Sequence, residues 1–307
     1  MLTVVRHGDT TRPASKLRFV ASSFLPVASA LTMIVASSSC SSSGSSAVAA
    51  TPPVRTIDLL PLVEQATTLP PPTVAPTTTA PPPPPTIATI PIGASVEPIP
   101  AIGRQSGEGA RRVQERLLEL GFWLQSANGD YGVTTRQAVM AFQKYRGLDP
   151  SESVDEATAV ALGEAQNRVV GHTDTGTLLE IDKTRQLMYL VVDGRTVWAF
   201  NVSTGSGVPY LERDKTEWGK WVRGDSQTPD GIFTIDREFE KGWRPGDLGE
   251  IYRPKYFNGG IAVHGAYKIP AHPASHGCVR VSTPAMDFLW SSGLAPRGTV
   301  VWVHSIA

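Results

Sequence analysis

The chain has 307 residues, 28 of them basic and 28 acidic, and therefore carries no formal net charge. A protein that binds nucleic acid needs a basic face, so this balance gives no support to a nucleic-acid partner. Fifteen of the 26 prolines lie between residues 52 and 100, and residues 1–106 contain just two aromatics, so the folded part is mostly the last two thirds of the chain.

The first 40 residues have the composition of an export segment. Basic residues within the first 18 positions precede a mainly apolar run over residues 19–36, the order found in secretory signals and membrane anchors. Three outcomes remain open: cleavage after Ala30, lipidation at Cys40, or retention of the run as an anchor. Cys40 follows among small residues as in a bacterial lipoprotein, although Ser37 stands where lipoproteins usually carry Leu or Val. We expect an extracytoplasmic, membrane-anchored protein.

Residues 41–104 are rich in serine, alanine, threonine and proline. Such a segment cannot bury a core, so we expect it to be disordered, with its proline runs extended as polyproline II. At roughly 3 Å per residue where extended, it would reach on the order of 100 Å from a membrane. We interpret it as a linker that carries the folded part into a cell wall.

The next region is predicted to be helical. Its apolar residues recur three and four positions apart in three stretches, 110–120, 134–145 and 155–162. Gly121 ends the first stretch, as a glycine after a helix does. Thr134 and Gln137 have the spacing of a capping box and predict the start of the second helix. Three short helices make a small bundle with its own core.

From Leu178 onward the apolar period falls to two, which indicates strands. We expect strands over residues 186–192, 195–203, 261–264 and 299–304, and one short helix over 284–291. Asp193-Gly194 between the first two strands is a strong signal for a two-residue hairpin. The expected fold class is α+β: a three-helix bundle followed by a mainly antiparallel β-sandwich.

Two long pieces of this region have no clear period. Residues 208–227 contain Trp218 and Trp221 together with several cations, and residues 239–256 contain Trp243 and Tyr256. Loops of this length in a compact domain are usually functional or disordered. Either they wall a groove for a peptide, or they are solvated loops with a tryptophan in the core, and the sequence leaves both interpretations open.

Residues 264–280 hold three of the six histidines and one of the two cysteines, Cys278. A cysteine attacks as the thiolate, so a working nucleophile needs a base or a positive charge nearby. His264, His276 and Arg280 are the local candidates. Gly277 permits a close approach of the backbone to a ligand, and its amide and that of Cys278 are candidate oxyanion donors.

Two alternatives compete with a nucleophile. Buried structural cysteines and core histidines are common in proteins. The other alternative is a zinc site, for which His264, His272, His276 and Cys278 would supply a tetrahedral set. The spacing of these residues fits none of the usual zinc patterns, so we expect no metal.

The order of these residues, His264-Gly265 and then Ser275-His276-Gly277-Cys278-Val279-Arg280, resembles the active-site signature of the L,D-transpeptidase (YkuD-type) family. The resemblance implies that Cys278 is the nucleophile, that His264 is its general base and proton donor, and that the Gly265 carbonyl orients His264. It makes His276 and Arg280 residues that shape the site. A base on a neighbouring strand is also better placed than His276, which is only two residues from the thiol. On the substrate side we expect Ser275, Tyr256 and Trp243.

The helical region resembles the peptidoglycan-binding domain 1 family. The matching residues are Val113-Gln114, Leu117, Leu120-Gly121-Phe122, Gly129-Asp130-Tyr131-Gly132, Thr134, Ala138-Val139, Phe142-Gln143, Gly147-Leu148 and Asp155. We expect a peptidoglycan-binding domain over residues 105–166 and a catalytic domain over residues 174–307.

The resemblance implies an enzyme of the cell wall or periplasm whose partners are peptidoglycan stem peptides and glycan. Cys278 would release D-alanine from a tetrapeptide stem, and a neighbouring amine would resolve the thioester into a 3→3 crosslink without a cofactor. Carbapenem-type β-lactams would acylate the same thiol. Two alternatives remain: an L,D-carboxypeptidase, in which water resolves the thioester, and a wall-binding protein without catalysis.

Overall fold

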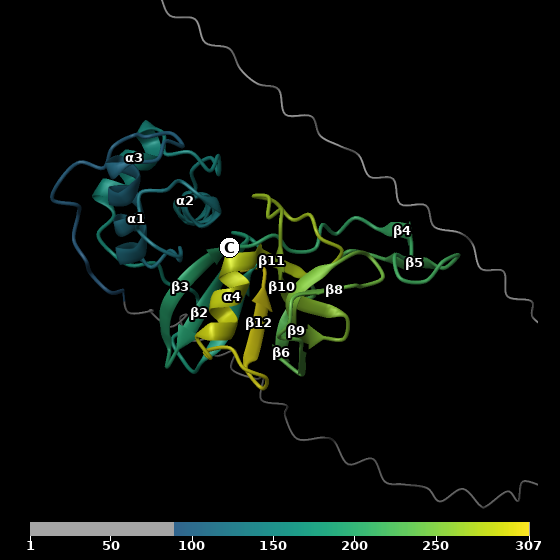
Figure 1. Cartoon of the computed structure of the whole chain (residues 1–307). Helices are drawn as coiled ribbons and strands as arrows, with labels where there is room; N and C mark the ends of the chain where they lie inside the picture. Colours follow the sequence, from purple (N-terminus) through teal and green to yellow (C-terminus); the bar gives the residue numbers. More distant parts are fainter. Residues whose placement is uncertain (1–88, 307) are drawn as a thin grey trace, which may run out of the picture. The chain divides into compact units, whose positions relative to one another are not determined.

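The computed structural model describes residues 89–306, so Cys40 and the proposed export segment lie outside the described residues. Three helices are followed by a mainly antiparallel β-rich domain (Figure 1), which confirms the predicted fold class. None of the helices in the described range is long and apolar enough to cross a membrane.

The bundle consists of α1 (Glu108–Leu120), α2 (Val133–Arg146) and α3 (Glu156–Glu164). Gly121 follows α1 with a φ of 87°, which confirms the predicted helix end. The predicted capping box is wrong: α2 begins at Val133 after Gly132 and has no side-chain cap. Thr134 therefore lies inside the helix, where its side chain cannot act as the N-cap.

The β-rich domain contains two five-stranded sheets and a two-stranded hairpin (Figure 1). The first sheet has the order β3 (Arg195–Asn201), β2 (Leu187–Val192), β1 (Leu178–Asp182), β12 (Val300–His304), β6 (Gly231–Thr234). The second has the order β11 (Val279–Ser282), β10 (Ile261–Ala266), β9 (Ile251–Asn258), β7 (Arg237–Glu238), with β8 (Trp243–Arg244) also paired to β9. The hairpin pairs β4 (Tyr210–Arg213) with β5 (Trp221–Gly224), and α4 spans Thr283–Ser291.

Two parallel contacts interrupt the antiparallel pattern. β1 pairs in parallel with β12, and β10 pairs in parallel with β11. The turn between β2 and β3 is the predicted hairpin, with positive φ angles at Asp193 (49°) and Gly194 (74°). Both values are those that a tight two-residue hairpin requires.

β2 is buried on both faces, which explains its continuous apolar sequence. Leu187, Tyr189 and Val191 pack into the same cluster as the helical bundle, whereas Met188 and Leu190 face the core between the two sheets. The prediction of a period of two is therefore wrong for this strand, because both of its faces are covered. The expected separate core of the bundle is also wrong, because its apolar cluster includes these residues of the sheet.

Candidate active site

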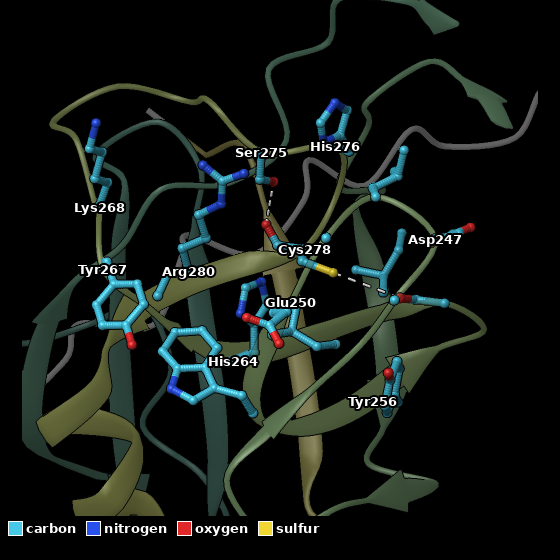
Figure 2. Close-up of a pocket in the computed structure, with 18 of the residues that line it drawn as sticks. Asp247, Glu250, Tyr256, His264, Tyr267, Lys268, Ser275, His276, Cys278 and Arg280 are labelled. Carbon is cyan, nitrogen blue, oxygen red and sulfur yellow. Dashed lines mark hydrogen bonds between the residues drawn. The ribbon is translucent and has the colours of Figure 1, made fainter. Parts of the chain in front are cut away.

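Cys278 and His264 line one cavity of about 690 Å³ at the ends of β10 and β11. Figure 2 shows both side chains, with Arg280 and Tyr267 on one side and Asp247 and Tyr256 on the other. Of the residues that the sequence singled out between positions 264 and 280, the cavity is lined by His264, Ser275, His276, Cys278 and Arg280, and it is not lined by Gly265, His272 or Gly277.

The parallel pairing of β10 and β11 positions the two central side chains. Val263 pairs with Val279, and His264 pairs with Arg280. Cys278 directly precedes β11, so it lies beside the residue before Val263. Since side chains alternate along a strand, Cys278, Arg280 and His264 share the face that borders the cavity.

An irregularity in β9 lies opposite His264. Val263 pairs with Lys255, and Gly265 pairs with Tyr252, so β9 contains one more residue than β10 between these pairs. Arg253 in this bulge has a positive φ of 48°. Bulges re-aim side chains next to active sites. Gly265 itself packs tightly, because a Cβ on it would lie 2.8 Å from the Tyr252 ring.

His264 is held as a neutral imidazole. Its Nδ1 donates to the Gly265 carbonyl oxygen at 2.9 Å, so the proton resides on Nδ1 and Nε2 is left as an acceptor. The pKa of His264 is lowered to about 4, chiefly by burial; the hydrogen bond to the Gly265 carbonyl opposes this shift, and the charge of Arg280 adds to it. At neutral pH the ring therefore carries no charge and can accept a proton.

The Cys278 sulfur is the matching partner, a thiol in its protonated form. Burial raises the pKa of the Cys278 thiol, against the Ala262 amide and Arg280, which favour the thiolate. The sulfur lies 3.7 Å from the Gly260 carbonyl oxygen, to which the S–H donates (Figure 2). A neutral thiol beside a neutral imidazole is suited to general-base activation at the moment of attack.

The turn before Cys278 is fixed by internal hydrogen bonds. Ser275 Oγ donates to the Cys278 carbonyl oxygen and accepts from the Gly277 N–H at 3.0 Å. Thr228 Oγ1 donates to the Gly277 carbonyl oxygen at 2.6 Å. The Ser275 hydroxyl thus braces the turn, and Ser275 also lines the cavity. The Gly277 amide is likewise occupied, which leaves the Cys278 amide as the candidate oxyanion donor.

Replacing Gly277 by alanine is expected to distort this turn. Gly277 has a φ of +132°, and a Cβ there would lie 2.8 Å from the Gln227 carbonyl oxygen. We expect a loss of about 1–3 kcal/mol in the free energy of unfolding and slower alkylation of Cys278. The matched control is Gly293→Ala, because Gly293 also has a positive φ (+66°) but open space around it. Denaturant unfolding measures both variants. An equal loss of unfolding free energy in the two would contradict a clash between the new Cβ and the Gln227 carbonyl oxygen.

His276 is held away from the sulfur by the β4–β5 hairpin. Its Nε2 lies 2.9 Å from Glu212 Oε1, and its ring meets the Tyr210 ring edge-on at 4.6 Å. Arg280 is half-buried at the cavity wall, and burial lowers its pKa. Among the described residues no carboxylate forms an ion pair with Arg280, so the cavity presents a guanidinium to its contents.

The two stretches without a clear period contain regular structure and also supply cavity walls. β4 and β5 form within residues 208–227, and β8 and most of β9 form within 239–256. Trp243 lines the cavity and stacks on Tyr267 at 4.4 Å. Trp218 is 96% exposed. The groove interpretation therefore fits Trp243, and the prediction of irregular structure is wrong because strand pairing across the chain orders these segments.

Comparison with known proteins identifies the family of each domain. The model of the L,D-transpeptidase catalytic domain (YkuD) matches residues 176–303, and that of a peptidoglycan binding domain matches residues 106–162. A solved L,D-transpeptidase from Xylanimonas cellulosilytica is 40% identical, with a TM-score of 0.58, and the match covers 68% of this chain and 98% of that one. The chain belongs to the L,D-transpeptidase family.

More distant structures carry the same family name but add nothing to this assignment. The L,D-transpeptidase from Stackebrandtia nassauensis is 18% identical, with a TM-score of 0.37, over 70% of this chain and 98% of that chain. One from Mycobacterium tuberculosis is 14% identical, with a TM-score of 0.33, over 47% of this chain and 62% of that chain. A comparison with curated protein sequences gives no match.

The zinc alternative is not supported in this transpeptidase domain. Within residues 89–306, one group of three side chains lies close enough together to hold a metal, and it consists of His172, Glu180 and His304. None of these belongs to the stretch from His264 to Arg280. Glu180 there is fully buried and accepts from the His172 N–H (2.7 Å), the Thr173 N–H (3.1 Å) and His304 (3.1 Å). These bonds fasten the segment between the two domains to β1.

Several residues of the transpeptidase site were missed by the sequence analysis. Tyr210 and Glu212 have no fixed spacing from the motif, so only the folded hairpin brings them to His276. Thr228 had a local signal, since it opens the turn Thr228-Pro229-Asp230-Gly231 that leads into β6. Asp247 and Glu250 lie in a stretch without periodicity and reach the cavity through the fold alone.

Proposed function

We propose that this protein is an L,D-transpeptidase that forms 3→3 crosslinks in peptidoglycan through a thioester on Cys278. One observation carries the proposal: a protonated thiol and a neutral imidazole lie on the same face of one cavity, and Nε2 of the imidazole has no hydrogen-bond partner among residues 89–306. Family membership supplies the reaction class, and the site supplies the two groups that the reaction needs.

The first step would be attack of Cys278 on the carbonyl that joins the third stem residue to the terminal D-alanine. Nε2 of His264 accepts the thiol proton as the S–C bond forms, and the Gly265 carbonyl stabilises the imidazolium through Nδ1–H. The Cys278 amide faces the oxyanion. When the tetrahedral intermediate collapses, the C–N bond breaks and His264 gives its proton to the leaving D-alanine amine.

The second step resolves the thioester. An amine of a neighbouring stem attacks the carbonyl, His264 accepts its proton, and the Cys278 thiolate leaves and is protonated again by His264. Water in place of the amine would give a carboxypeptidase. We favour transfer because the aromatic side chains of Trp243, Tyr267 and Tyr256 border the cavity and offer apolar surface against which the acceptor stem would pack.

The cations of the cavity wall would select the substrate. Arg280 is half-buried without a carboxylate partner among the described residues, and Lys268 lies nearby on the same side of the cavity (Figure 2). Stem peptides carry free carboxylates, which a guanidinium binds in a bidentate manner. Carbapenems present a carboxylate beside an acylating carbonyl, so we expect them to use the same contacts.

The bundle and the N-terminal segment would place this reaction at the wall. We propose that the bundle binds peptidoglycan, as its family name states, and that the protein is extracytoplasmic and held near the membrane by residues 1–40. Sedimentation of the full chain with insoluble peptidoglycan tests the first proposal, and its recovery with membranes or in culture medium tests the second.

The decisive test is mass spectrometry of muropeptides after incubation with the purified full chain. We expect loss of the terminal D-alanine from tetrapeptide stems and the appearance of dimers whose crosslink joins two third residues. Trimmed monomers without dimers would make the protein a carboxypeptidase. Unchanged muropeptides together with sedimentation on peptidoglycan would make it a wall-binding protein.

A further inference from the structure

The helical bundle and the first sheet share one apolar core. Phe122, Phe142 and Val169 of the N-terminal region lie in the same buried cluster as Tyr189 and Ala199 of the sheet. The bundle therefore covers a sheet face that would otherwise expose apolar side chains to water. If the bundle moved independently as a tethering domain, its departure would expose this apolar face of the sheet to water, which is unfavourable.

Main-chain hydrogen bonds reinforce this contact. Ala199 of β3 donates to the Gly121 carbonyl oxygen at 2.8 Å and accepts from the Trp123 N–H at 3.0 Å. The Trp123 side chain continues past β3 into the core of the sandwich, where its ring lies 5.2 Å from Phe288. Residues 121–123 after α1 thus pair with β3 at the edge of the first sheet.

Helix α2 adds polar contacts to the end of β3. Lys144 Nζ donates to Oδ1 of Asn201 and to the carbonyl oxygens of Gln186 (3.1 Å) and Val202 (3.2 Å). Gln137, two helical turns earlier, accepts from Asn201 Nδ2 at 2.7 Å. Asn201 is only 4% exposed, so both of its polar atoms are satisfied from α2.

The half-buried Lys144 ammonium needs hydrogen-bond acceptors in place of the water it loses. No carboxylate forms an ion pair with Lys144 in the described part of the chain, and burial lowers the pKa of Lys144 to about 7. A half-buried ammonium held only by neutral oxygens is tolerated when all its donors are used. The three oxygens around Lys144 provide this, and all three belong to the catalytic domain.

The segment from the end of β3, to which Lys144 donates at Asn201 and Val202, is hydrogen-bonded to the loop before the Cys278 turn. Asn201 Nδ2 also lies 3.4 Å from the Ile269 carbonyl oxygen, and Ser203 Oγ donates to the His272 carbonyl oxygen at 2.8 Å. Thr204 O accepts from the N–H groups of Ala274 (2.9 Å) and Ser275 (3.0 Å). These bonds hold the loop that carries Ser275 into the turn before Cys278.

Gln186 connects Lys144 to the same segment from the other side. The Gln186 carbonyl oxygen is one of the three acceptors of Lys144. Its side chain donates to Thr204 Oγ1 and accepts from the Thr204 N–H, both at 2.8 Å. Gln186 is 4% exposed and Thr204 is 1% exposed, so water does not compete for these bonds. A shift of Lys144 is therefore transmitted to Thr204 and to the loop it supports.

We propose that helix α2 of the peptidoglycan-binding bundle is part of the catalytic scaffold, and that Lys144 and Gln137 are positioning residues for the Cys278 turn. They act through Asn201 and the segment 202–205, and neither touches the substrate. The inference rests on the proposed function for its kinetic consequence only. It makes the bundle a support for catalysis in addition to a wall-binding module.

The test compares variants of the full chain that carry Cys40→Ala, so that Cys278 is the single thiol. Lys144→Met removes the ammonium and keeps the apolar stem, Lys144→Arg restores hydrogen-bond donors, and Gln137→Leu is a milder variant should Lys144→Met fail to fold. Arg146→Met is the matched control, because Arg146 is exposed on the same helix. Circular dichroism establishes that each variant is folded.

Two measurements follow. In hydrogen exchange, Lys144→Met and Gln137→Leu should speed exchange of the Ala274 and Ser275 amides, with Arg146→Met unchanged. In acylation by a carbapenem, the rate at saturation should fall about ten-fold or more in Lys144→Met, with little change in the half-saturating concentration and partial rescue in Lys144→Arg.

The outcomes separate the inference from the proposed function. If folded Lys144→Met and Gln137→Leu variants exchange these amides at the wild-type rate, the inference is overturned whatever the activity. If the amides respond but even the wild-type chain is not acylated, the positioning contact stands and the proposed function fails. A loss confined to the half-saturating concentration would assign α2 to ligand binding and would also overturn the inference.

Discussion

A Cys278→Ala variant is expected to form no covalent adduct with a carbapenem and to release no D-alanine from stem peptides. The reason is chemical: the thioester needs a sulfur, and Cys278 is the only cysteine among residues 89–306. The fold should be unaffected, because the sulfur bonds only weakly to its surroundings, through a long contact with the Gly260 carbonyl oxygen and through the Ala262 amide, and alanine fits the space it leaves. Intact-mass spectrometry after incubation with the carbapenem measures the adduct directly.

The control for this variant is the wild-type chain blocked by prior alkylation of Cys278, which keeps every other group in place. Both proteins should still sediment with peptidoglycan, since the proposed binding surface belongs to the bundle. A carbapenem adduct on Cys278→Ala, mapped to another residue of the cavity, would remove the nucleophile assignment and with it the proposed reaction.

Local signals in the sequence predicted much of this structure. The glycine after α1, the Asp193-Gly194 hairpin and the helical spacing in the bundle all depend on residues close together in the chain, and the structure confirms them. Short-range rules of backbone geometry are sufficient for such features. The roles of His264 and Cys278 came instead from the family resemblance of the motif, and the parallel pairing of β10 with β11 brings the two side chains to one cavity.

Features that depend on distant partners were not predictable. The run Leu187–Val192 is apolar throughout because the bundle covers its outer face, and no local pattern says so. Glu212 reaches His276 only after β4 and β5 pair. The extra residue in β9 opposite His264 appears only in the register between two strands. In each case the cause is tertiary packing, which overrides or supplements local preference.

A His264→Ala variant is expected to lose about 10²–10⁴-fold in the rate of acylation, the range that a positioned general base contributes. His264 carries no charge at neutral pH, and its Nδ1–H is fixed on the Gly265 carbonyl, so Nε2 is the acceptor that the variant removes. The thiol pKa itself should change little, because burial, the Ala262 amide and Arg280 determine it. Stopped-flow acylation and the pH dependence of alkylation measure the two effects separately.

The pH profile gives an independent check on the base. Since the pKa of His264 is lowered to about 4 by burial, the wild-type acylation rate should stay level as the pH falls through 6.5 and decline only near pH 4. Unfolded His264 would bind its proton near pH 6.5, roughly the value of a free imidazole. The unfolded state therefore binds more protons between pH 6.5 and 4, so this residue also reduces stability as the pH falls through that range.

His276→Ala is the matched comparison, because it removes a second imidazole from the same cavity. His276 is tied to Glu212 on the β4–β5 hairpin and packs against Tyr210, so its loss should loosen the hairpin and change carbapenem binding. The acid limb near pH 4 should remain, since His264 is untouched. If the limb instead disappeared with His276 and persisted in His264→Ala, the base would be His276, and the bulge in β9 would need another explanation than the aiming of His264.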